Sequence, residues 1–108
     1  MDNILTDLQD IIAERRSNPE EGSYTAYLFS KGLDKMLKKC GEECSEMIIA
    51  AKNRDKAELC GEVADLLYHM AVVMNEQELS VDEVQTLLQE RGMKKNNLKN
   101  FHSVDKNT

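Results

Sequence analysis

The helical spacing of apolar residues is the feature that most constrains the fold of this chain. In several segments, apolar side chains recur every three or four residues, the repeat that gathers them on one face of an α-helix. A sustained alternation of apolar and polar residues, which is typical of strands, occurs nowhere in the sequence. We therefore predict an all-α fold, a helical bundle of four to five helices.

Breaks in this pattern delimit the first two helices. The first is predicted over about residues 3–16, and the loop that follows it contains the chain's one proline, Pro19. A long helix then begins somewhere between Ser23 and Gly32, because the glycine leaves its start open, and it ends near Asn53. The first helix carries an apolar face that can dock on the other helices.

Two capping-box patterns mark the starts of further helices. In such a box a Ser, Thr or Asp side chain caps the helix, and a Glu three residues later supports the same turn. The two pairs are Asp55 with Glu58 and Ser80 with Glu83. They predict a third helix over residues 55–76 and a short last helix that stops at Gly92.

The length of the chain limits it to one domain. Its 108 residues can bury one modest hydrophobic core but are too few for two domains. We expect an all-α domain over residues 1–93 and a flexible C-terminal tail over residues 94–108, which are rich in Lys and Asn. Because small helical chains often complete their core by pairing, we also expect a homodimer.

Charge and composition exclude several classes of partner. The 14 basic and 20 acidic residues give a net charge of −6, and the lysines form no long stripe interleaved with aromatics, so no nucleic acid is expected. No apolar run is long enough to span a membrane, and the N-terminus lacks a secretory pattern, so we expect a cytoplasmic protein without a membrane partner. The odd number of cysteines fits reduced thiols, with Cys40 and Cys44 buried on an apolar stripe.

The long helix carries an unusual density of carboxylates beside its apolar stripe. Successive residues advance by roughly 100° around a helix, so Glu43 and Glu46 are neighbours on one rim of the stripe, whereas Glu42 lies furthest from it. Three further polar side chains lie toward the same rim: Lys35, Lys39 and Asn53.

The third helix repeats this arrangement. Glu62 falls inside its apolar stripe, Asp65 borders the stripe, and His69 lies on the same side. A short turn would lay the two helices antiparallel and bring four carboxylates together. Such a cluster needs a cation, and oxygen ligands favour Mg²⁺ or Mn²⁺, ions that readily take phosphate oxygens as further ligands. The pattern therefore favours a phosphate-containing substrate.

Other interpretations of these residues stay open from the sequence. Each Glu can be a solvated residue paired with a lysine, and His69 can be a packed core histidine. A di-iron site would need Glu-x-x-His pairs, which the sequence lacks. A zinc site would need Cys40, Cys44, Cys60 and His69, without the usual C-x-x-C spacing.

The acidic pattern resembles a known signature. Glu42-Glu43-x-x-Glu46, followed after 15 residues by Glu62-x-x-Asp65, is similar to the motif of the all-α, MazG-like nucleoside triphosphate pyrophosphohydrolases. The surrounding segments resemble the phosphoribosyl-ATP pyrophosphohydrolase family, which acts in the second step of histidine biosynthesis. They are SYTAYLF at 23–29, KGLDKMLKKCGEECSEMIIAAKN at 31–53 and EVADLLYHM at 62–70, and the resemblance covers about residues 4–92.

This resemblance implies a function and a metal site. The family hydrolyses the α,β-phosphate bond of phosphoribosyl-ATP with Mg²⁺, for which Mn²⁺ is a conceivable substitute. The metal ligands would be Glu43, Glu46, Glu62 and Asp65. Glu42 would be either an outer base that helps to deprotonate the attacking water or an exposed neighbour.

We add candidates for substrate contacts and for a partner. Lys35 and Lys39 are expected at the polyphosphate, Lys52 and Asn53 at the nucleoside or ribose, with Tyr68 and His69 as weaker candidates. A separate phosphoribosyl-AMP cyclohydrolase would be a transient partner, because family members are frequently fused to one and this chain is too short to include it. The alternatives are a general, house-cleaning nucleoside triphosphate pyrophosphohydrolase and a non-catalytic helical interaction module.

Overall fold

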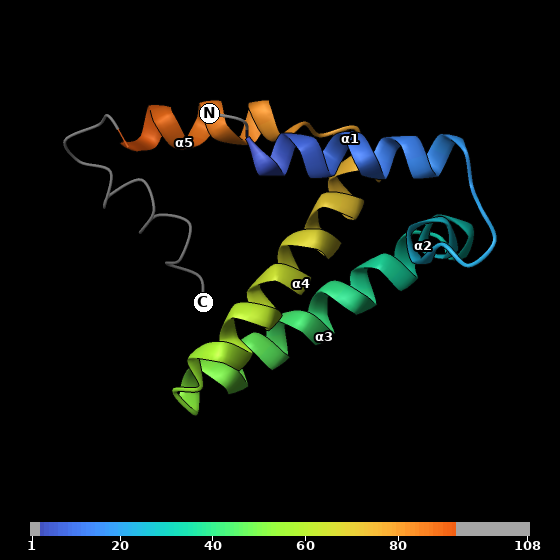
Figure 1. Cartoon of the computed structure of the whole chain (residues 1–108). Helices are drawn as coiled ribbons and strands as arrows, with labels where there is room; N and C mark the ends of the chain where they lie inside the picture. The colour runs from blue at the N-terminus through green and yellow to red at the C-terminus, as the bar shows by residue number, and fades with distance from the viewer. Residues whose placement is uncertain (1–2, 93–108) are drawn as a thin grey trace.

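Five α-helices make up the part of the chain that this computed structural model describes, residues 3–92 (Figure 1). They are α1 (Ile4–Ser17), α2 (Tyr24–Lys31), α3 (Leu33–Lys52), α4 (Lys56–Glu76) and α5 (Val81–Gly92). Residues 3–92 contain no strand, which confirms the predicted all-α fold. None of these helices is both long and apolar enough to cross a membrane. The tail predicted at 94–108 lies outside the described residues.

Local capping interactions start the helices where the sequence predicts them. The Asn3 side chain accepts a hydrogen bond from the backbone of Leu5 at 3.0 Å and caps α1. Asp55 accepts one from the backbone N–H of Glu58 at 3.1 Å and caps α4. The box that opens α5 is complete, because the Glu83 N–H donates to Ser80 Oγ at 3.1 Å and the Ser80 N–H donates to Glu83 Oε2 at 2.7 Å.

Gly32 divides the predicted long helix into α2 and α3. Its φ is +94°, a backbone conformation that L-residues with a side chain rarely adopt, so the helix cannot run through it. Ser23 caps the first piece by accepting a hydrogen bond from Ala26 N at 3.1 Å. The two limits predicted for the start, Ser23 and Gly32, are therefore the caps of two separate helices.

The core lies where α1, α2, the start of α3 and the end of α4 meet. Its buried side chains are Ile12, Leu28, Met36, Ala71 and Val72. From this core α3 and α4 extend together as a helical hairpin, away from α1 and α5 (Figure 1). The hairpin closes through the turn at Arg54, whose φ is +56°.

Helix α4 does not pack against the middle of the apolar stripe that the sequence predicts on α3. The buried residues of α3 are Met36, Glu43 and Ala50, spaced seven apart, so this row faces α4. Leu37 is 49% exposed and Ile48 is 59% exposed in the single chain. Cys44, which we expected to be buried, is exposed for the same reason, and Cys40 is half-buried.

Candidate active site

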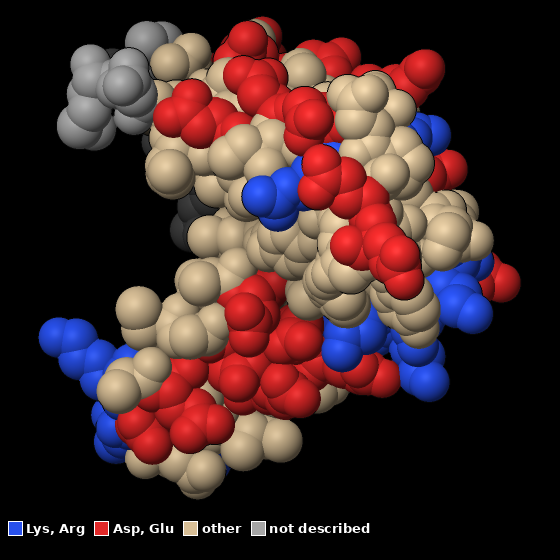
Figure 2. Space-filling view, turned by 45° about the vertical axis from the view of Figure 1, so that its right-hand side comes forward, with Lys and Arg blue, Asp and Glu red and all other residues tan. Residues whose placement is uncertain are grey.

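Three carboxylates from the two helices of the hairpin converge in its seam. Glu43 on α3 and Glu62 and Asp65 on α4 each offer a carboxylate oxygen, and these oxygens lie within 4.8 Å of one another. Glu43 is only 7% exposed because it occupies the buried row between Met36 and Ala50. Figure 2 shows acidic side chains gathered over the hairpin, next to a group of basic ones.

Glu46 extends this carboxylate group along α3. Its side chain interacts with Glu62 strongly enough to be the largest cause of the raised pKa of Glu62, which is about 7 instead of 4.5. Partial burial and the nearby Glu43 raise the pKa of Glu62 further. The four carboxylates predicted from the sequence thus form one continuous group, in which Glu43 is buried, Glu62 is half-buried, and Glu46 and Asp65 are exposed.

Two oxygens of this group have the surroundings expected of metal ligands. Glu43 Oε2 and Glu62 Oε2 are buried from solvent, and neither accepts a hydrogen bond within the described residues. A buried carboxylate oxygen without a donor is costly unless a proton or a cation faces it. A hard divalent cation fits this donor set, because all the ligand atoms are carboxylate oxygens.

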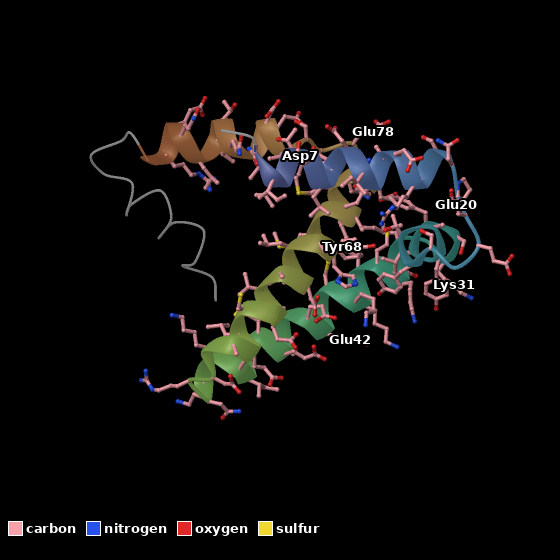
Figure 3. All side chains as sticks on the ribbon, in the orientation of Figure 1. Asp7, Glu20, Lys31, Glu42, Tyr68 and Glu78 are labelled. Atoms are coloured by element: carbon pink, nitrogen blue, oxygen red, sulfur yellow. The ribbon has the colours of Figure 1, made fainter. Side chains whose placement is uncertain are left out.

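Glu42 lies outside the seam and is held by a lysine. Its Oε2 accepts a hydrogen bond from Lys39 Nζ at 3.1 Å, and this bond holds the pKa of Glu42 below its usual range. Figure 3 shows Glu42 on the outer side of α3. Lys39 Nζ also lies 3.8 Å from Glu43 Oε1, so this lysine links the exposed and the buried carboxylate.

The other side chains predicted to contact the substrate lie on α3 or at its C-terminal end. Lys35 is half-buried one turn before Lys39, with its Nζ 6.0 Å from the centre of the Tyr27 ring. Asn53 lines a cavity of about 370 Å³ at the turn of the hairpin, together with Glu46 and Glu62. Lys52 is exposed and does not line that cavity.

A hydrogen-bonded cluster on the other side of the carboxylates joins α2 to α4. The Asp65 backbone carbonyl lies 2.7 Å from His69 Nδ1, and since a carbonyl can only accept, Nδ1 carries the proton. His69 Nε2 then accepts from the Tyr24 hydroxyl at 3.0 Å. Tyr68 points toward α2 (Figure 3) and shares a 2.5 Å hydrogen bond with Thr25.

This cluster holds His69 in the core, beside two residues that sequence patterns did not place there. His69 is 6% exposed and uses both ring nitrogens, which agrees with a packed core histidine. Tyr24 and Thr25 were not predicted near the site, because the contacts join residues 45 and 43 positions apart. A second cavity, of about 710 Å³, lies beside Tyr24 and Tyr68 at the loop between α1 and α2.

The cysteines do not form the alternative zinc site. Within residues 3–92, the group of potential metal ligands that lie close together consists of Glu43, Glu62 and Asp65, without a thiol. Burial, and then the nearby charge of Glu43, raises the pKa of the Cys40 thiol. A thiol that holds its proton is a poor nucleophile, so Cys40 is a packing residue.

Comparison with known protein families gives one match that covers most of the chain. Residues 5–92 match the family described as phosphoribosyl-ATP pyrophosphohydrolase. The matched segment contains all five helices from Leu5 onward and every carboxylate of the group in the hairpin.

Individual relatives agree with this match. The phosphoribosyl-ATP pyrophosphatase of Streptococcus sanguinis is 49% identical over 102 residues, which are 94% of this chain and 98% of that protein. The enzyme of the same name from Clostridium botulinum is 51% identical over 98 residues, 91% of this chain and 89% of that protein. The histidine biosynthesis bifunctional protein HisIE of Halalkalibacterium halodurans is 59% identical over 88 residues, 82% of this chain but only 42% of that protein. The chain thus spans less than half of the bifunctional relative.

Proposed function

The chain belongs to the phosphoribosyl-ATP pyrophosphohydrolase family, and from this membership we propose that it hydrolyses the α,β-phosphate bond of phosphoribosyl-ATP. The products are phosphoribosyl-AMP and pyrophosphate, in the second step of histidine biosynthesis. One observation of the structure supports this proposal above all others. Glu43, Glu62 and Asp65 converge within 4.8 Å, and two of their oxygens are buried without a hydrogen-bond donor.

The four carboxylates are the proposed ligands of Mg²⁺, or of Mn²⁺ in its place. Glu43, Glu62 and Asp65 would supply the three oxygens that lie within 4.8 Å of one another, and Glu46 would supply one from beside Glu62. When bound, the ion would neutralise phosphate charge and lower the pKa of a water molecule. We assign no covalent nucleophile to this reaction, so the side chains would bind the triphosphate and hold it for in-line attack by water.

The positive charges beside the seam are assigned to the phosphates. Lys39 and Lys35 lie on one face of α3, one turn apart, and Lys39 reaches Glu43. Ammonium groups in this position can bind the phosphoryl oxygens that leave as pyrophosphate. Asn53 and its cavity are assigned to the nucleoside, and Lys52 is the weakest of these assignments because it lies outside that cavity.

We assign to Glu42 the role of binding Lys39, and not the role of a base that deprotonates the attacking water. The lysine lowers the pKa of Glu42, which makes this carboxylate a weaker base. Its exposed position on the outer side of α3 supports the same assignment. Glu42 would therefore orient Lys39 and take no part in proton transfer.

A homodimer is the proposed assembly, and a separate cyclohydrolase as a transient partner stays a prediction. The support for the dimer is apolar surface on the single chain, including a groove of about 220 Å³ between α4 and α5. Residues that line the groove include Leu67, Met70, Met74 and Leu88. Exposed apolar area of this kind is more typical of an interface than of a monomer surface. We expect the reaction to take place in the cytoplasm.

Substitution of one ligand against a matched control tests the proposed function. We expect Asp65→Asn to lower kcat by about 100-fold or more, because it weakens the group that binds the ion. Asp34→Asn removes the same charge from an exposed site in the first turn of α3 and should change kcat by less than about twofold. Full activity of Asp65→Asn would exclude the proposed site.

Phosphorus NMR of the products tests the bond that is cleaved. Attack at the α,β-bond releases pyrophosphate, whereas attack at the β,γ-bond releases orthophosphate. The proposed function requires pyrophosphate and phosphoribosyl-AMP without orthophosphate, and orthophosphate as the first product would contradict it.

A further inference from the structure

Lys39 lies at the edge of the proposed ligand group, beside two carboxylates. Its Nζ lies between an exposed and a buried carboxylate, 3.1 Å from Glu42 Oε2 and 3.8 Å from Glu43 Oε1. The Lys39 side chain is 27% exposed, so its ammonium group lies at the border between the seam and solvent. Its hydrogen bond to Glu42 raises the pKa of Lys39, which keeps the group cationic.

The two oxygens of Glu43 face different surroundings. Oε1 is the atom near Lys39, whereas Oε2 is buried without a donor. Lys39 therefore compensates part of the charge of Glu43, and a cation held by Glu43, Glu62 and Asp65 would compensate all of it. Because the ligand oxygens lie within 4.8 Å of one another, such a cation would come close enough to Lys39 to repel it.

Repulsion would move the ammonium group in one direction. The inner side of Lys39 is closed by the buried Glu43, and its outer side is open next to Glu42 and solvent. Released from Glu43, the lysine keeps its hydrogen bond to Glu42 and presents its remaining donors outward. These donors would then face a phosphate group that the same cation binds.

We propose that Lys39 is an internal counter-ion that competes with the divalent cation for Glu43 and is released by it to bind the phosphates of the substrate. The inference rests on the proposed function for the substrate, but the competition itself needs only the carboxylates and a cation. It makes the binding of cation and substrate mutually favourable, because each requires Lys39 to leave Glu43. Lys39 is in this respect a positioning residue as well as a phosphate contact.

The test compares three variants by isothermal titration with MnCl₂ in the absence of substrate. Lys39→Met removes the competing charge and should tighten the binding of Mn²⁺ by about two- to fivefold, the range for a partly exposed ion pair. Lys39→Arg keeps the charge and should bind Mn²⁺ within about twofold of the unmodified chain. Lys38→Met removes a neighbouring charge that forms no ion pair within residues 3–92 and should also stay within about twofold.

For the substrate we expect the opposite effect of Lys39→Met, a loss of catalytic efficiency instead of a gain in binding. At saturating Mn²⁺, Lys39→Met should lower kcat/KM for phosphoribosyl-ATP by about tenfold or more, because a phosphate contact is lost, and Lys38→Met should not. Tighter metal binding together with weaker use of substrate is a combination that simple loss of structure cannot produce. Unfolding by urea without metal confirms that each variant is folded.

Each outcome separates this inference from the proposed function. Unchanged or weaker binding of Mn²⁺ by Lys39→Met would overturn the competition even if the unmodified chain hydrolyses the substrate. Tighter binding with no hydrolysis by any chain would support the competition and overturn the proposed function. Absence of Mn²⁺ binding to the unmodified chain without substrate would overturn the competition, whereas hydrolysis of phosphoribosyl-ATP with excess metal still decides the proposed function.

Discussion

Removal of the charge on Glu62 should change how the stability of the protein depends on pH. Glu62→Gln keeps the shape of the side chain and removes the group whose pKa is raised most, to about 7 from the ordinary 4.5. Between these two pH values the folded chain holds a proton that the unfolded chain releases. The contribution of Glu62 to stability is therefore largest below about pH 4.5, falls as the pH rises through this interval, and is constant above pH 7.

The size of the effect follows from the two pKa values. Near pH 5.8, a carboxyl group with a pKa of about 7 is almost fully protonated and one with a pKa of 4.5 is almost fully ionised. The folded and unfolded chains then differ by about 0.9 proton, which sets the slope of the unfolding free energy against pH.

Urea unfolding followed by circular dichroism in EDTA, at steps from pH 5 to pH 8, measures this slope. We expect the variant to lose the downward slope, to differ least from the unmodified chain at pH 5, and to exceed it most at pH 8 because fewer like charges meet in the seam. Glu90→Gln, on the exposed side of α5, should leave the slope unchanged. If Glu62→Gln had the same pH slope as the unmodified chain, the assignment of the proton to Glu62 would be refuted.

Three further expectations concern the metal, the helix break and the assembly. MgCl₂ at about 100 times its Kd should stabilise the unmodified chain by about 2.7 kcal/mol at pH 8, and Glu62→Gln by much less; equal gains in urea unfolding would contradict the site. Gly32→Ala should destabilise the chain by about 1–3 kcal/mol because its φ of +94° is strained for alanine, whereas Gly61→Ala, inside α4 with open space around it, should stabilise it by about 1 kcal/mol; equal urea midpoints would refute the argument. Light scattering at micromolar concentration should give the mass of a dimer, and Met70→Glu in the apolar groove should give a monomer; a monomer mass for the unmodified chain would end the dimer proposal.

The helix starts could be predicted because their signals are local. Asp55 with Glu58, and Ser80 with Glu83, need only neighbours three residues away, and the structure contains the expected capping bonds. Gly32 was harder to interpret, since a glycine inside a helix costs only about 1 kcal/mol relative to alanine and is compatible with either a break or a continuous helix. Its φ, which decides the matter, depends on how α2 and α3 pack.

The carboxylate group could be anticipated, but the face of α3 that it occupies could not. Angular positions on a helix show which residues are neighbours, and they brought Glu43 beside Glu46 and Glu62 beside Asp65. They do not show where the partner helix lies. The structure packs α4 on the row of Met36, Glu43 and Ala50, so Glu43 lies in the seam and the apolar stripe that includes Ile48 is left exposed.

Contacts between distant segments were beyond the reach of sequence patterns. The bonds of Tyr24 to His69 and of Thr25 to Tyr68 depend on the placement of α2 against α4. No periodicity or capping signal encodes this placement, because it follows from the side chains that fill the core. Lys39 is an intermediate case, since its spacing predicts a pair with Glu43 but not the burial of that carboxylate.

Release of pyrophosphate distinguishes metal-dependent hydrolysis of phosphoribosyl-ATP from hydrolysis of other nucleotides. The assay compares phosphoribosyl-ATP with ATP and dUTP, first with Mg²⁺ and then with EDTA. We predict fast release from phosphoribosyl-ATP alone and its loss with EDTA. Comparable release from ATP or dUTP would contradict the substrate, and release that persists in EDTA would contradict the role assigned to the four carboxylates.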